Sequence, residues 1–235
     1  MIEKLREMIL ELLYPTRARC LGCGDEEGCD EPFLCEECRK LLKASDVLTS
    51  HREWKEHGLE AAAFVYYYGR PIRGLIRAYK FQGVWMLAEN MAQDMERLLR
   101  RRMPLEFDMI VPVPLHPARQ RDRGYNQAEM LARPLAESCG VELRTDVLSR
   151  VRKTKQQSKL KRSSRAGNTH SAFCAKNDLT GKRILLVDDV VTTGSTLCAC
   201  SDALKAAGAK EIHAIALAGS RMCGKYRSVR YRRKK

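Results

Sequence analysis

The chain has 235 residues, of which 43 are Lys or Arg and 29 are Asp or Glu, so its net charge is +14. Apolar residues make up 44% of it, and no apolar run approaches the ~20 residues that span a bilayer. Charged residues among the apolar ones near the N-terminus exclude a signal peptide, and ten cysteines then indicate a reducing compartment. We therefore expect a cytoplasmic protein with one moderate α/β domain and a small appendage.

Two stretches concentrate the positive charge. Arg150–Arg165 and Arg221–Lys235 each hold eight basic residues and no acidic one. Such clusters indicate a partner that carries phosphates, either a small ligand or a nucleic acid, and a solvated surface is the alternative. The first stretch has few apolar residues, so we expect a mobile loop there, and residues 221–235 form a basic C-terminal tail.

The first predicted element is a short amphipathic helix over residues 2–13. Two Cys-x2-Cys pairs follow, with eleven residues between them: Cys20, Cys23, Cys35 and Cys38. Each pair can supply two corners of a tetrahedral site, which predicts a structural Zn²⁺ closed by four thiolates, with disulfides as the alternative. Residues 1–45 therefore form a zinc module.

The main domain is predicted to begin after a polar linker with some helix at residues 46–60. Ala61–Tyr68 is expected to be its first strand, followed by a helix from Ile72 to near Gly83 and another over residues 86–102. A short strand is expected at Met109–Val111. The domain extends over residues 61–220.

A proline-rich turn, Pro112–Pro117, interrupts the chain directly after that short strand. The next predicted helix runs from Gly124 to Glu137, and Pro134 should split or bend it. Arg119 and Arg123 lie just before this helix, where its dipole disfavours cations, so they are candidates to face an anionic ligand; a solvated loop is the alternative. Asp146–Ser149 is expected to be a further short strand.

Ile184–Thr196, with the sequence ILLVDDVVTTGST, is the most informative stretch. Its four leading apolar residues predict a strand buried on both faces, and two carboxylates, Asp188 and Asp189, follow. A small-residue loop then leads into a helix over Ser195–Ala207, whose N-terminus favours an anion. Two carboxylates beside a phosphate cradle indicate a ligand with vicinal hydroxyls and a phosphate, such as a ribose 5-phosphate. A plain strand with a capped helix is the alternative.

These thirteen residues match, at every position, the motif with which type I phosphoribosyltransferases bind phosphoribosyl pyrophosphate (PRPP). The paired cysteines, YKFQG at residues 79–83 and VPVPLHPARQRDRGYNQAEMLA at residues 111–132 precede it. So does the pattern of Thr154, Gln157, Leu160, Arg165 and Asn168. In this order, the fragments resemble the ComF/GntX family over essentially the whole chain before Arg221.

The resemblance implies an α/β fold of the type I phosphoribosyltransferase kind, with a Rossmann-like, mainly parallel sheet flanked by helices, and an N-terminal zinc module. It implies binding of PRPP with Mg²⁺, in which Asp188 and Asp189 hold the ribose hydroxyls. The 5′-phosphate would then be held by five loop residues: Thr192, Thr193, Gly194, Ser195 and Thr196. Five basic residues are candidates for the pyrophosphate and for a lid over it: Arg119, Arg123, Lys155, Lys159 and Arg165.

Relatives in this family are associated with natural competence and the handling of incoming single-stranded DNA. The resemblance thus implies single-stranded DNA and other competence proteins, including a helicase-like one, as partners. Two classes of function stay open. One is a phosphoribosyltransferase of unknown acceptor, and the other is a non-catalytic binder of DNA or protein that uses the fold as a scaffold. A purine or pyrimidine salvage enzyme is a third reading, against which the zinc module counts.

Overall fold

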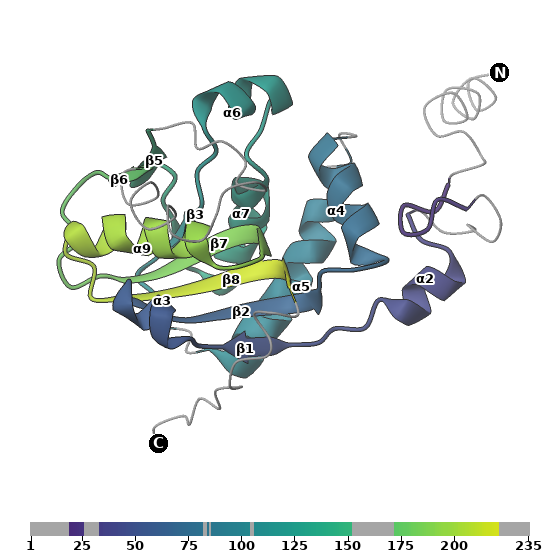
Figure 1. The fold of residues 1–235 in the computed structure, drawn as a ribbon, viewed down its shortest axis with the longest axis horizontal. Coiled ribbons are helices and arrows are strands. Elements are labelled where there is room, and N and C mark those ends of the chain that lie inside the picture. The colour runs from purple at the N-terminus through teal and green to yellow at the C-terminus, as the bar shows by residue number, and fades with distance from the viewer. Residues whose placement is uncertain are drawn as a thin grey trace, which may run out of the picture.

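The computed structural model describes residues 19–25, 33–81, 84, 86–103, 106–151 and 172–220 (Figure 1). The predicted N-terminal helix, the basic loop beyond Val151 and the C-terminal tail lie outside these ranges. None of the helices in the described ranges is long and apolar enough to cross a membrane.

A six-stranded sheet forms the centre of the main domain, in the order β1-β2-β8-β7-β3-β4. β1 runs antiparallel to β2, and every other neighbouring pair is parallel. The strands are β1 (Val47–Thr49), β2 (Leu59–Tyr67), β3 (Met109–Pro112), β4 (Glu142–Leu143), β7 (Arg183–Val191) and β8 (Glu211–Gly219). The predicted mainly parallel α/β architecture is therefore confirmed.

Both faces of the sheet are covered, which explains the unbroken apolar run at the start of β7. Leu185 and Val187 pack into one buried cluster, and Ile184 and Leu186 pack into another on the opposite face. The first cluster lies under α4 (Ile72–Phe81), α5 (Leu87–Arg102) and α7 (Gln127–Cys139). The second lies under α9 (Ser195–Ala206), α3 (Arg52–Glu56) and a separate hairpin of β5 (Leu148–Arg150) and β6 (Phe173–Ala175) (Figure 1).

Two regions differ from the sequence-based expectation. The segment predicted as a polar linker with some helix contains helix α3, whose Trp54 is buried, and also the edge strand β1, which was not predicted. A three-residue strand carries too little periodicity to be recognised. The predicted helix beginning at Gly124 instead starts at Gln127, because Gly124 ends a separate helix, α6 (Pro117–Arg123), with φ of 80°.

Helix α7 continues through Pro134, which the sequence predicts as a split or a bend. A proline removes one backbone hydrogen bond from a helix interior, and burial can offset that loss. Leu131, Ala132 and Leu135, on either side of Pro134, are buried completely against the sheet. Packing of the apolar face therefore holds α7 as one element.

Candidate functional site

The two motif carboxylates lie near the carboxyl end of β7, beside the end of α4. Asp189 is 8% exposed, and its Oδ2 lies 2.6 Å from Nζ of Lys80, in the last turn of α4. Asp188 accepts a hydrogen bond at Oδ1 from the backbone N–H of Asp189, at 2.8 Å. The sequence marks Lys80 only as part of YKFQG, and the fold brings it to the acidic pair.

Asp188 is the titratable group most affected by this arrangement. Burial, and next the negative charge of Asp189, raise the pKa of its carboxyl to about 7. The charges of Lys80 and Arg150 oppose this rise without cancelling it. The carboxyl therefore titrates near neutral pH, where a hydroxyl group that donates a hydrogen bond would stabilise its ionised form.

The loop between β7 and α9 has the geometry expected of an anion cradle. Gly194 is the N-cap of α9 with φ of 82°, which glycine adopts without strain. The Thr193 hydroxyl accepts a hydrogen bond from the Ser195 N–H at 3.4 Å and lies 3.1 Å from the Ser195 hydroxyl. Thr192, Thr193 and Ser195 are exposed, and no acidic residue occupies the first turn of α9. The partial positive charge of this helix end is thus open to an anion.

Trp54 supports this loop from α3, and sequence reasoning did not identify it. Its indole Nε1 donates to the backbone carbonyl of Thr193 at 3.4 Å. A Cβ atom at Gly194 would lie 2.5 Å from the same nitrogen, so the indole packs directly on the glycine backbone. His57, at the end of α3, contacts Asp202 of α9 at 2.9 Å, which fixes α3 against α9.

The proline-rich turn leads from β3 into α6, the helix that carries both predicted arginines, Arg119 and Arg123. Asn126 Nδ2 donates to the Val113 carbonyl at 3.2 Å and so ties this turn to the start of α7. Arg123 donates to Gln127 Oε1 at 2.9 Å, and its guanidinium lies 4.8 Å from the Phe81 ring centroid. Arg123 therefore bridges α6, α7 and the end of α4.

Arg150, at the end of β5, is a further basic residue of the site. Its guanidinium lies 5.3 Å from the Phe173 ring centroid, and its charge acts on Asp188. Burial, and next the charge of Arg119, lower the pKa of Arg150, so these two arginines face the same region. The sequence gives no signal that separates Arg150 from the other basic residues after it. Lys155, Lys159 and Arg165, the predicted lid residues, lie outside the described ranges.

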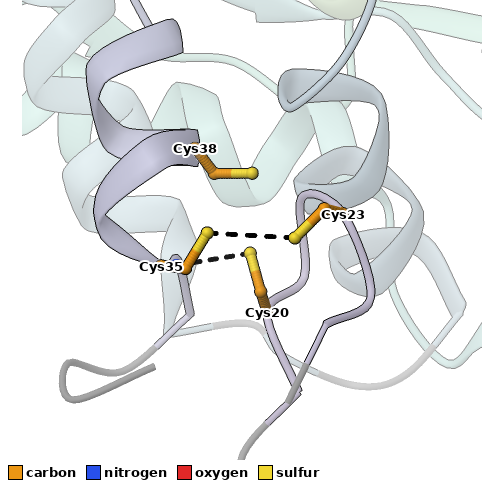
Figure 2. Close-up of side chains that lie close together, drawn as sticks. All are labelled: Cys20, Cys23, Cys35 and Cys38. Atoms are coloured by element: carbon orange, nitrogen blue, oxygen red, sulfur yellow. Dashed lines mark hydrogen bonds between the residues drawn. The ribbon is translucent and has the colours of Figure 1, made fainter. Parts of the chain in front are cut away.

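The four cysteines predicted to bind zinc form one cluster, with all four Sγ atoms within 4.8 Å of one another (Figure 2). Cys23 Sγ and Cys35 Sγ are 3.8 Å apart. Tetrahedral Zn–S bonds of about 2.3 Å require about the same separation between sulfurs. The residues therefore fit a four-thiolate zinc ion. One pair lies on a turn and the other at the start of α2 (Glu36–Leu41).

The environment of the cluster shifts the pKa values of its thiols. Burial raises the pKa of the Cys20 thiol, but backbone N–H groups pointing at its sulfur, first that of Cys35 at 3.3 Å, bring the pKa down to about 6. Burial and the neighbouring thiols raise the pKa of Cys38. A metal would displace the remaining thiol protons, so its affinity should increase with pH.

Two glycines allow the cysteine module to pack against α4. A Cβ atom at Gly74 of α4 would lie 1.9 Å from the backbone carbonyl oxygen of Leu21. A Cβ atom at Gly22 would lie 2.6 Å from Pro71 and 2.8 Å from the Cys38 sulfur. The module therefore rests on the same helix that carries Lys80 into the acidic pair.

Comparison with known proteins identifies the class to which this fold and site belong. The family model described as "Phosphoribosyl transferase domain" matches residues 95–233. A purine phosphoribosyltransferase from Pyrococcus horikoshii is 23% identical, with a TM-score of 0.37 over 57% of this chain and 73% of that chain. The chain belongs to the phosphoribosyltransferase domain family.

Within that family the chain belongs to the ComF-like proteins, as the resemblance predicted. "Competence protein F" of Haemophilus influenzae is 29% identical over 228 residues, covering 85% of this chain and 96% of the relative. "Competence protein ComFC" of Streptococcus pneumoniae is 32% identical over 211 residues, with 88% and 90% covered. "DNA utilization protein YhgH" of Escherichia coli K12 is 32% identical over 201 residues, with 82% and 86% covered.

Proposed function

We propose that this protein binds PRPP with Mg²⁺ at the carboxyl ends of β3 and β7. The observation that carries the proposal is the acidic pair, half-buried Asp188 and buried Asp189, directly before a hydroxyl-rich loop that opens a helix N-terminus. Vicinal ribose hydroxyls need two acceptors, and a phosphate needs N–H and hydroxyl donors. The site offers both within a single strand–loop–helix unit.

In this proposal the chain's own residues bind and orient the ligand. Asp188 and Asp189 accept the 2′- and 3′-hydroxyl hydrogen bonds, and Lys80 limits the negative charge of the pair. The 5′-phosphate lies on the N–H groups and hydroxyls of residues 192–196, while Trp54 fixes the loop's backbone. Mg²⁺, bound through the phosphates with several waters retained, would neutralise the pyrophosphate charge. In the same proposal, Arg119, Arg123 and Arg150 supply positive charge to that pyrophosphate.

We further propose that the protein acts in the handling of incoming DNA, as the names of its competence and DNA utilization relatives indicate. A net charge of +14 supports contact with a polyanion. If the protein is a phosphoribosyltransferase, an acceptor nitrogen displaces pyrophosphate from C1 of PRPP, and positioning of charge supplies most of the rate. The second candidate is a non-catalytic factor that holds single-stranded DNA or a competence protein.

Calorimetric titration of PRPP in the presence of Mg²⁺ tests the site. Wild type should bind PRPP, and Asp188→Asn with Asp189→Asn should abolish binding, because the amides donate hydrogen bonds where the ribose needs acceptors. Circular dichroism controls for folding. Unchanged PRPP affinity in the double variant would contradict the assignment of Asp188 and Asp189 to the ribose hydroxyls. Pyrophosphate release that depends on one added base or amine distinguishes the enzyme from the binder.

A further inference from the structure

Helix α4 and the turn before it present a row of basic side chains without a single acid. Residues 68–81 read YGRPIRGLIRAYKF. Arg70, Arg73 and Arg77 are exposed, and within the described part of the chain they make no salt bridge. By contrast, two exposed arginines on other helices have acidic partners: Arg100 with Glu96 at 2.7 Å on α5, and Arg133 with Glu129 at 2.8 Å on α7. The α4 row is therefore an uncompensated positive surface.

These side chains share one face of the helix. Arg73 and Arg77 are one turn apart, and Lys80 and Phe81 follow on the next turn. The opposite face, with Ile72, Leu75, Ile76 and Tyr79, is buried in the core. The row thus runs along the helix axis for about 15 Å, at the helical rise of about 1.5 Å per residue, and ends at the Lys80–Asp189 pair.

An exposed aromatic ring lies at each end of the row. Tyr68 is 40% exposed and lines a cavity of about 270 Å³ with Leu41, Lys43 and Arg70 among its other lining residues. Phe81 is 66% exposed, with the Arg123 guanidinium 4.8 Å from its ring centroid. Exposed rings flanking a line of cations are what unpaired bases and a phosphate backbone require: the rings stack on bases and the cations pair with phosphates.

We infer that Tyr68, Arg70, Arg73, Arg77 and Phe81, the α4 track, bind single-stranded nucleic acid along α4. The track accommodates a few nucleotides and directs the strand toward the acidic pair on β7. A duplex would keep its bases stacked inside and leave the two rings without partners. This inference deepens the proposed DNA-handling role and does not depend on PRPP binding.

The test measures the affinity of a fluorescent oligothymidylate by anisotropy at several salt concentrations. Arg73→Gln with Arg77→Gln is compared with Arg97→Gln with Arg100→Gln, which removes the same charge from α5. We expect the α4 pair to lower affinity at least tenfold at low salt and to reduce the slope of log affinity against log salt by about 1.4, or ~0.7 per lost phosphate contact. The α5 pair should change the slope by less than half as much.

A second arm replaces both rings, as Tyr68→Ala with Phe81→Ala. Affinity should fall about tenfold or more while the salt slope stays unchanged, because stacking carries no charge. Thermal melting confirms that each variant is folded, and a duplex of equal length should compete poorly. Equal losses from the α4 and α5 pairs, or unchanged binding after removal of the rings, would overturn the inference.

The PRPP titration separates this inference from the proposed function. Asp188→Asn with Asp189→Asn should leave oligothymidylate binding intact, and Arg73→Gln with Arg77→Gln should leave PRPP binding intact. If wild type did not bind PRPP, the proposed PRPP site would be contradicted and the α4 track would not. If the α4 variants did not weaken DNA binding, the α4 track would be contradicted and the PRPP site would not.

Discussion

Asp188 shows how its position in the sheet changes the chemistry of a carboxyl group. The sequence presents it as one of two adjacent acids, both equally available to a ligand. The fold holds it half-buried beside Asp189 and raises its pKa to about 7, while Lys80 pairs with Asp189 rather than with Asp188. A ligand-binding group held in this way costs folding free energy that ligand binding would recover.

We predict that Asp188→Asn stabilises the free protein at pH 8 and does so less at pH 5. The folded-state pKa lies above the ordinary value of 3.8, so the wild type loses stability as pH rises from about 4 through about 7, and the amide does not. Melting temperatures of both proteins across this range measure the difference. Asp178→Asn is the control, because hydrogen bonds from Thr180 lower the pKa of that carboxyl and should give no such gain. A constant difference at all pH values would contradict the assignment.

At the scale of elements, the loop between β7 and α9 depends on the contact between α3 and the start of α9. Gly194 combines a positive φ with a close approach of the Trp54 indole. The His57–Asp202 contact then prevents α3 from moving away from α9 to relieve any crowding. The loop between β7 and α9 is therefore held together with α3, although α3 lies far from both in the sequence.

Gly194→Ala should therefore lower the free energy of unfolding by about 2–4 kcal/mol, since it combines left-handed strain with a clash. Gly124→Ala is the matched control, with a φ of 80° and no atom within 4 Å of the added Cβ. It should cost only about 1 kcal/mol, the backbone contribution alone. Urea denaturation of both variants measures the difference, and equal losses would show that Trp54 leaves the loop's stability unaffected.

A second prediction at this scale concerns the contact between α4 and the cysteine module. Alanine usually stabilises a helix interior relative to glycine by about 0.5–1 kcal/mol. Gly74→Ala should instead destabilise, because its Cβ would lie 1.9 Å from the Leu21 carbonyl oxygen. Limited proteolysis within residues 19–45 should become faster. Gly69→Ala, whose Cβ meets no atom within 4 Å, should leave the rate unchanged; a similar rate for both variants would argue against the contact.

For the whole molecule, the zinc module and the main domain share a core. Cys20, Leu34 and Cys38 belong to the same buried cluster as Leu75 of α4 and Leu185 of β7. The module is therefore packed into the core of the main domain, although the sequence predicts a linker between the module and that domain. Changes at the metal site should reach the sheet through α4.

We expect one zinc ion per chain by elemental analysis, and its loss in Cys35→Ser with Cys38→Ser. Thermal melting of the whole protein, rather than of the module alone, should shift to lower temperature by several degrees, because the cysteines are part of the shared core. Cys174→Ser, at an exposed cysteine outside the cluster, should retain both the zinc and the melting temperature. A metal-free wild type, or an unchanged melting temperature after the double substitution, would contradict this picture.

Features that depend on short stretches of chain could be predicted without a structure. The apolar run before Asp188 predicted β7, the spacing of Cys20, Cys23, Cys35 and Cys38 predicted the four-sulfur cluster, and the resemblance carried by short motifs predicted the mainly parallel sheet. Periodicity, spacing and turn chemistry act over a few residues, so they can be recognised without a fold.

The contacts between groups far apart in the chain could not be predicted and follow from the fold. It placed Lys80 on Asp189, Arg150 beside Asp188 and Trp54 under Gly194, and it kept α7 continuous through Pro134. The strand order, in which β8 lies between β2 and β7, brings elements together that are far apart in the chain. Such contacts follow from how both faces of the sheet are covered, and burial there outweighs the local preferences that the sequence displays.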